Sequence, residues 1–305
     1  MGAVVSGFSA RNVAFHGLPS SKIVKYAPNV EEAIRLADLD WTVSLAPVYH
    51  QKTMDGVETY SPVDGKFLTV REDTQQVLGS VGRNYRTFQN ADAFDFANEL
   101  LGFGVEFDAA GHYADSTKVF LTAKVPTGIT VPGTDDNLDL YLLFKTSHDG
   151  SSAIQAQVTP VRLACTNMLN LATRNAISKW SARHTAKASE KIEEAARTLQ
   201  LVDAYRSEFE QISAQLLATE VTMEGFESLV EEVTVSERLR VGMINTWNNS
   251  PTLMGPNGWS AVNAIGEYLE FERGGRGSVE TRFDSNIDGQ TAAIRNRAAR
   301  LLLVR

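Results

Sequence analysis

The sequence predicts an α+β protein, in which a small antiparallel β-meander is crossed by a helix and followed by a mostly helical C-terminal region. Two observations support this prediction. Between residues 105 and 162, four strand-like segments are joined by short turns, as in a meander. After residue 189, apolar residues recur at helical spacing instead. We therefore expect a flexible N-terminal arm (1–25), an α+β core that contains the sheet (26–186) and a helical region (187–305).

The segment before the meander is predicted to begin with a helix and to continue as short strands. APNVEEAIRLADLDW opens with Pro-Asn, and two glutamates follow in the expected first turn, where negative charge faces the positive end of the helix dipole. WTVSLAPVYH and KFLTVRED are predicted strands, with turns at Asp55-Gly56 and Asp64-Gly65. NADAFDFANELLG is predicted to be a short helix that is capped by Asn90.

The meander and the helical region are distinguished by their periodicity. The expected strands of the meander are VEFDAAGHYA, KVFLTAKV, DLYLLFKTSH and SAIQAQVTPVR. NMLNLATRNAISKW is then expected to be a helix, and SEKIEEAARTLQLVDAYRSEFEQISAQLLAT a long one. Four shorter helices complete the chain: TMEGFESLVEEV, SERLRVGMINTWNN, WSAVNAIGEYLEFER and QTAAIRNRAARLLLVR.

The charge of the chain is unevenly distributed. The formal net charge is −8, which by itself argues against a nucleic-acid partner. However, residues 190–240 hold 12 acidic and 5 basic residues and so carry nearly all of the excess. Residues 151–189 contain no acidic residue and five basic ones. A basic stretch therefore runs directly into an acidic one.

Several classes of protein are disfavoured by what the sequence lacks. No apolar run approaches the roughly 18 residues of a membrane helix, and no signal-peptide pattern is present, so we expect a cytoplasmic protein without membrane contact. There is no phosphate-binding loop, dinucleotide fingerprint or nucleophile elbow, and the histidines are far apart. We therefore expect no enzymatic activity, no cofactor and no metal.

The single cysteine, Cys165, lies between a predicted strand and a predicted helix. It could serve as a nucleophile with His148 or His184 as its base. A lone cysteine in such a place is more commonly a small buried hydrophobe, and we favour that interpretation.

Two segments combine basic and aromatic residues in the way that suits single-stranded nucleic acid. In GRNYRTF and in ISKWSARHTAK, cations alternate with rings. Cations can meet phosphates while rings stack on bases. A strand that buries its rings and exposes its arginines gives the same pattern. The candidate contacts in these segments are Arg83, Tyr85, Arg86, Lys179, Arg183 and Lys187.

Arginines also flank the corner TPVRLACTNMLNLATRNA. Arg162 stands where the last strand of the meander meets a predicted helix, and a buried guanidinium needs a partner. Two interpretations remain open for Arg162: an internal ion pair, for example with Asp139, or a phosphate contact. Arg174 follows in the predicted helix.

Four blocks of the chain resemble the phage and plasmid proteins grouped as domain of unknown function 932. In order, they are LDWTV, LGSVGRNYRTFQNADAFDFANELL, TPVRLACTNML and GWSAVNAIGEYLEFER, and the resemblance covers residues 30 to 300. The second and third blocks are the most specific. In the fourth, the family tends to place a histidine after the acidic residue, where this chain has Phe271 after Glu270.

The resemblance implies a role in recombination or replication of phage or plasmid DNA. A small sheet crossed by a helix is also similar in outline to the Rad52-like single-strand annealing proteins, a likeness of fold alone. Such proteins assemble as rings or arcs and hold single-stranded DNA by its backbone in a basic groove. Carried over to this chain, the resemblance suggests groove contacts at Arg83, Tyr85, Arg86, Arg162, Arg174 and Lys179.

The leading hypothesis is therefore a phage- or plasmid-encoded protein that binds and anneals single-stranded DNA without covalent chemistry. Its expected partners are single-stranded DNA, further copies of itself, and a host or phage replication protein. The alternative is an anti-restriction or defence-evasion protein that binds a host factor through its acidic face, which would mimic the charge of DNA. An enzyme that uses Cys165 is a third hypothesis.

Overall fold

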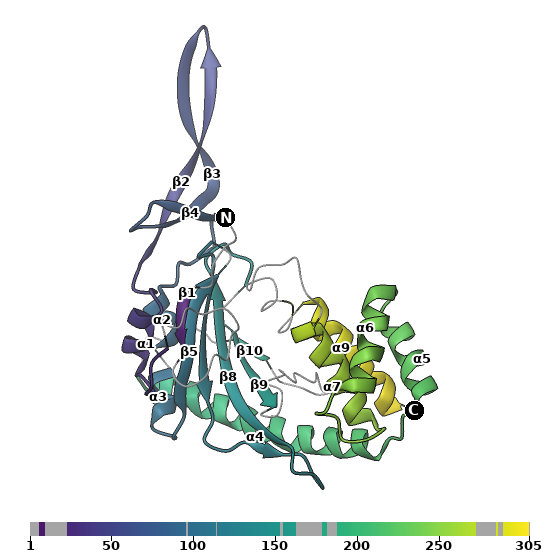
Figure 1. The fold of residues 1–305 in the computed structure, drawn as a ribbon. Coiled ribbons are helices and arrows are strands. Elements are labelled where there is room, and N and C mark those ends of the chain that lie inside the picture. Colours follow the sequence, from purple (N-terminus) through teal and green to yellow (C-terminus); the bar gives the residue numbers. More distant parts are fainter. Residues whose placement is uncertain are drawn as a thin grey trace.

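A computed structural model describes residues 6–9, 23–95, 97–113, 115–152, 155–162, 179–181, 188–272, 285 and 289–304. Two antiparallel sheets precede a group of helices along the chain (Figure 1). The predicted α+β class is confirmed.

The large sheet contains the predicted meander. Its strand order is β1-β5-β6-β8-β9-β10, and the short β7 pairs with β8. All its pairs are antiparallel. For β5, β6, β8 and β9 this follows from the short connections between the strands, whereas β1 and β10 are added from more distant parts of the chain. The strands are β1 (Ser6–Ser9), β5 (Glu106–Tyr113), β6 (Lys118–Lys124), β7 (Ile129–Thr130), β8 (Asn137–Ser147), β9 (Gln155–Arg162) and β10 (Lys179–Ser181).

Two parts of the large sheet differ from the expectation. Within the expected flexible arm, Ser6–Ser9 form strand β1 along the edge of β5. Lys179–Ser181, predicted to be helical up to Trp180, form strand β10 opposite Gln157–Gln155. In both cases pairing with a distant strand outweighs the local pattern. The rest of the predicted helix that follows Thr166 lies outside the described residues.

The hairpin sheet consists of β2 (Val43–Met54), β3 (Val57–Arg71) and β4 (Gln76–Gly82). Asp55 and Gly56 form the predicted turn, with φ of 50° and 79°, as a two-residue hairpin loop requires. The predicted turn at Asp64-Gly65 is wrong. The register passes from Pro47 opposite Phe67 to Tyr49 opposite Pro62, so extra residues form a bulge and the hairpin continues past it.

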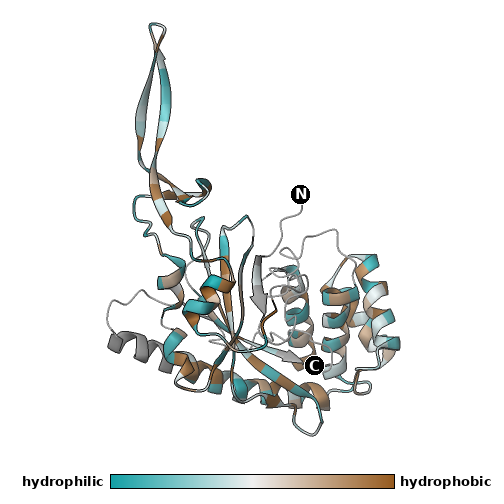
Figure 2. Cartoon of the chain, turned by 60° about the vertical axis from the view of Figure 1, so that its left-hand side comes forward, coloured by the Kyte–Doolittle hydropathy of each residue, from teal (hydrophilic) through white to brown (hydrophobic). Residues whose placement is uncertain are grey.

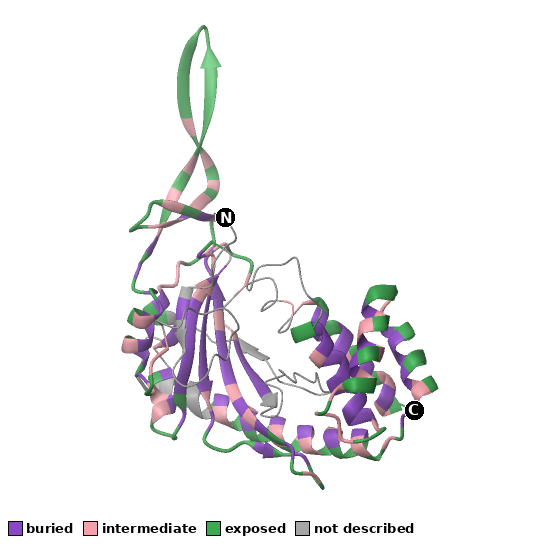
Figure 3. Ribbon diagram, viewed as in Figure 1, coloured by how far each residue is buried: buried purple, intermediate pink, exposed green. Residues whose placement is uncertain are grey.

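The hairpin extends well beyond the rest of the molecule. Its outer part stands away from the large sheet (Figure 1) and is coloured as exposed, in contrast to the buried middle strands (Figure 3). Hydrophobic residues nevertheless occur along it (Figure 2).

In the large sheet, the segment Thr134–Asn137 is expected from the sequence to be a turn, and it connects β7 to β8.

Short helices pack beside the large sheet. They are α1 (Val30–Leu36), α2 (Asn90–Phe94) and α3 (Ala97–Leu101). As predicted, α1 begins after Asn29, whose side chain accepts a hydrogen bond from the backbone N–H of Glu32 at 2.8 Å. The predicted helix of NADAFDFANELLG is divided into α2 and α3, and Asn90 does not cap it.

The helical region agrees closely with the predicted periodicity. It comprises α4 (Ala188–Ala218), α5 (Met223–Val233), α6 (Glu237–Asn249), α7 (Gly258–Glu267), the π-helical turn η2 (Tyr268–Glu272) and α9 (Gln290–Val304). The fully buried Trp259 of α7 packs edge-on against Phe209 of α4, with ring centroids 5.9 Å apart. Its indole N–H donates to Asp136, before β8, at 3.1 Å. This contact fixes the helices to the large sheet.

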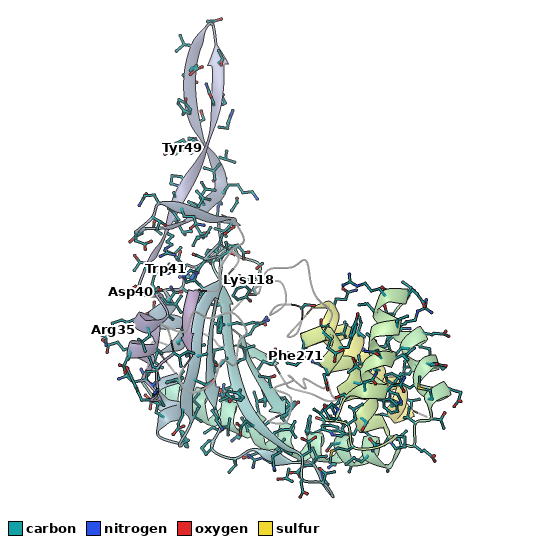
Figure 4. All side chains as sticks on the ribbon, in the orientation of Figure 1. Arg35, Asp40, Trp41, Tyr49, Lys118 and Phe271 are labelled. Atoms are coloured by element: carbon teal, nitrogen blue, oxygen red, sulfur yellow. The ribbon has the colours of Figure 1, made fainter. Side chains whose placement is uncertain are left out.

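The π-helical turn creates a buried ion pair. Arg295 of α9 donates from Nη1 to Oε1 of Glu270, and the two side chains are 0% and 2% exposed. The wider turn points Glu270 inward, whereas Phe271 is 36% exposed (Figure 4). The spacing in WSAVNAIGEYLEFER predicts an ordinary helix, and the π-helical turn at its end departs from that prediction.

Candidate functional site at the joint of the two sheets

The joint is the place where the hairpin sheet meets residues 148–152, the turn between β8 and β9. Gly79 of β4 lies directly against this turn: a Cβ atom on Gly79 would stand 2.5 Å from the Cα of Asp149. Two backbones therefore approach more closely than any side chain permits. The Oδ1 of Asp149 accepts a hydrogen bond from the N–H of Ser151 at 2.8 Å, which stabilises the turn.

Replacing Gly79 with alanine is expected to lower the free energy of unfolding by about 1–3 kcal/mol, because backbone atoms would have to move apart. The measurement is chemical denaturation. Gly82→Ala is the matched control in the same strand, since a Cβ there meets no atom within 4 Å. Equal losses for the two variants would contradict the close approach at Gly79.

A cluster around Trp41 fixes the base of the hairpin. The Arg71 guanidinium lies 4.6 Å from the centroid of the Trp41 ring, a cation–π contact. Arg71 also binds Asp73 through two hydrogen bonds of 2.7 and 2.8 Å and donates to Ser116 at 3.0 Å. The hydrogen bond from Arg71 lowers the pKa of Asp73. Arg71 is thus held by both sheets. Figure 4 shows Trp41 at this end of the large sheet, near Lys118.

His148 is buried at the centre of the joint. Its ring lies 5.1 Å from Trp41, edge to face. The Nδ2 of Asn90 donates to the carbonyl of Leu39 at 2.9 Å, so the Oδ1 of Asn90 faces the Nε2 of His148, 2.8 Å away. Nε2 must therefore carry the proton and donate it. Burial lowers the pKa of His148 to about 4, although the charge of Asp149 opposes this effect. The imidazole is neutral at pH 7.

Three predicted contact residues follow β4 and have different environments. Arg83 is exposed and donates to the carboxylate of Asp64 at 2.5 Å. Tyr85 is partly buried beside Gly150, and burial, followed by the charge of Asp149, raises the pKa of its hydroxyl. Arg86 is exposed. Arg86 and Arg83 are thus both at the surface, but Arg83 is already bound to Asp64.

The second predicted segment reaches the same end of the large sheet. Ser181 of β10 is opposite Gln155, the first residue of β9, and Lys179 is opposite Gln157. Residues 148–152, against which Gly79 and Tyr85 pack, precede β9 by two positions. One segment therefore packs on this turn and the other pairs with the start of the strand that follows it, although nearly a hundred positions separate the two in the sequence.

Arg162 is not part of this group. It ends β9 opposite Leu138, five residues beyond the position paired with Lys179 and so roughly 17 Å along the strand. Asp139, its candidate ion-pair partner, binds Lys124 at 2.5 Å. The backbone alone of Arg162 and Lys179 is described. Arg174, Arg183, Lys187 and Cys165 lie outside the described residues.

Sequence reasoning did not identify Trp41, Arg71 or Asn90 as parts of the joint. The available signal was that LDWTV and LGSVGRNYRTFQNADAFDF are the blocks that carry the family resemblance. These blocks supply Trp41, Gly79, Tyr85 and Asn90 to the joint. A polar residue such as Asn90, at a plausible helix start, gives no sign that its partner is distant.

The described residues form neither a metal-binding cluster nor a membrane-spanning helix. No group of three or more His, Cys, Asp or Glu side chains there could hold a metal ion. No helix in that part of the chain has the length and apolarity needed to cross a membrane.

The fold and the joint define an α+β protein in which a projecting hairpin is fixed to a meander by a buried polar cluster. The chain belongs to the family described as domain of unknown function 932 (DUF932), whose model matches residues 77–299. This match begins in β4 and includes most of the joint, while β2 and all of β3 precede it. No curated protein and no solved structure matched the chain.

Proposed function

We propose that this protein binds single-stranded DNA at the joint end of the large sheet and helps complementary strands to pair. The observation that carries the proposal is that two sequence-distant basic and aromatic segments reach one end of the large sheet: Tyr85 packs beside Gly150, and Lys179–Ser181 pair with the start of β9. Phosphates would be held by Arg86 and Lys179, and a base would stack on an aromatic ring nearby. Pairing makes and breaks no covalent bond, so the proposed activity requires neither catalysis nor a cofactor.

The distribution of charge supports a groove of this kind. Residues 151–189, which include β9 and β10, contain no acidic side chain, so a phosphate backbone along this edge meets no repulsion from them. At the joint itself, Arg83 is opposed by Asp64, and Arg71 by Asp73. We therefore assign the phosphate contacts to Arg86 and Lys179 rather than to Arg83. The proposal also includes association of several copies along one strand.

Replacing Arg86 and Lys179 with alanine is expected to weaken binding of a labelled single-stranded oligonucleotide. Each lost phosphate contact should reduce the slope of log affinity against log salt by about 0.7, and the pair should lower affinity roughly tenfold or more. Lys52→Ala, at an exposed lysine of the hairpin, is the control and should bind like the wild type. If the Arg86 and Lys179 variants keep the wild-type slope of log affinity against log salt, these two residues do not contact phosphate.

A second candidate function is binding of a host factor through the acidic face of α5. Glu224, Glu227, Glu231 and Glu232 are exposed on this helix, while Phe226, Leu229, Val230 and Val233 face the core. The test is retention of a host nuclease on the immobilised protein. Retention that is lost on changing the four glutamates to glutamine, together with no affinity for DNA, would favour this candidate over the first.

A further inference from the structure

The outer hairpin exposes aromatic side chains on one face. Tyr49 is 55% exposed and Tyr60 is 65% exposed. In the register, Tyr49 is opposite Pro62 and Tyr60 is opposite Gln51. Because residues two apart on a strand share a face, both rings lie on the same side of the ribbon. Figure 4 shows Tyr49 on this projecting arm, away from the helices.

The outer hairpin has the features of a surface that binds another molecule. Among the described strands, β4 pairs only with Lys66–Arg71 of β3, so both edges of the ribbon between Tyr49 and Pro62 are unpaired. A two-stranded hairpin is marginally stable by itself, and exposed apolar surface on such an arm marks an interaction site. Its charges nearly cancel: Lys52 is offset by Asp55 and Glu58. Such a surface suits a protein better than a phosphate backbone.

The helical region has a small pocket with matching chemistry. Trp247, Leu253, Gly255 and Pro256 line a volume of about 250 Å³, and none of the four is charged. Pockets for drug-sized ligands are larger, about 300–1,000 Å³, so this one suits a single large side chain. The pocket lies at the end of α6 and in the loop that leads to α7.

Ring stacking and hydrogen bonds hold the walls of the pocket in place. Trp247 stacks on Phe226 of α5, with ring centroids 4.4 Å apart. The following loop is fixed by Glu267, whose carboxylate accepts hydrogen bonds of 2.8 Å from both Ser250 and Thr252. The pocket is therefore formed in advance of binding, which reduces the ordering needed when a partner enters.

We propose that the tyrosine face of the hairpin of one copy docks into the Trp247 pocket of a second copy. The hairpin points away from its own helices (Figure 1), so the contact joins two molecules. The two surfaces differ, and a contact between unlike surfaces repeats from copy to copy, giving rings, arcs or filaments. This inference builds on the self-association included in the proposed function and assigns it to specific surfaces.

Two variants and their mixture test the contact in the absence of DNA. Sedimentation should show the wild type as assemblies that grow with concentration, and Tyr60→Ser and Leu253→Glu as monomers. An equimolar mixture of the two variants retains one intact hairpin and one intact pocket for each pair, so it should form a dimer and nothing larger. Phe103→Ser removes an exposed aromatic residue elsewhere (51% exposed) and should assemble like the wild type.

A monomeric wild type, variants that still assemble, or a mixture that stays monomeric would each overturn the proposal. Thermal unfolding checks that each variant is folded. Tyr49→Ser and Pro256→Glu repeat the pair at second positions, so that loss of fold in one variant does not decide the result. DNA binding is measured separately. A wild type that assembles but ignores DNA would leave this contact standing while removing the proposed function.

Discussion

Replacing Arg295 with methionine is expected to lower the free energy of unfolding by about 3–5 kcal/mol. Arg295 and Glu270 form an ion pair with side chains that are 0% and 2% exposed. Methionine has similar bulk but would leave the carboxylate of Glu270 buried without this cation. Removing one partner of such a pair is much more destabilising than replacing both.

A double-mutant cycle tests this account of the ion pair. Glu270→Leu combined with Arg295→Met should be more stable than the sum of the two single changes predicts. Arg240→Met is the control: its bridge to Glu237 is at the surface, with side chains 27% and 76% exposed, and should contribute less than about 1 kcal/mol. Additive losses in the buried pair, measured by chemical denaturation, would show that the two groups are not coupled.

Lowering the pH from 6.5 to 4 is expected to destabilise the protein through His148 by on the order of 3 kcal/mol. The folded protein holds this histidine neutral, with its pKa lowered to about 4 from 6.5. Between these values the unfolded chain binds a proton that the folded protein does not. The contribution of His148 to stability is therefore fully present above pH 6.5 and is lost as the pH falls toward 4.

The variant His148→Gln isolates this contribution, because glutamine can still donate toward Asn90 but does not titrate in this range. Its stability should depend less steeply on pH than that of the wild type between pH 6.5 and 4. The control is His50→Gln, at an exposed histidine of the hairpin, which should keep the wild-type dependence. Parallel curves for His148→Gln and the wild type would refute the assignment.

The sequence predicted the meander and most helices because their signals are local. Turn residues separate the strands of the large sheet, and apolar spacing marks α4 to α9. The same local signals failed where distant contacts decide. Asp64-Gly65 has the composition of a turn, but pairing on both sides of it makes it a bulge. Lys179–Ser181 form a strand because β9 offers an edge.

The candidate site was predicted only in part. The pattern of GRNYRTF drew attention to the segment that forms the joint, but it did not show that Arg83 binds Asp64, 19 positions earlier. Asn90 looked like a helix cap, whereas its side chain connects Leu39 and His148, which are 51 and 58 positions away. The fold determines such partners. No regular spacing in a single sequence indicates which distant residues will meet.

Salt-dependent binding of single-stranded DNA tests the central claim most directly. Fluorescence anisotropy of a labelled oligonucleotide should show saturable binding at low salt. Affinity should then fall linearly in a log–log plot as salt rises, because phosphate contacts release counterions. An unlabelled duplex should compete more weakly than an unlabelled single strand. Absence of binding at low salt, or an affinity that does not respond to salt, would contradict the proposed function.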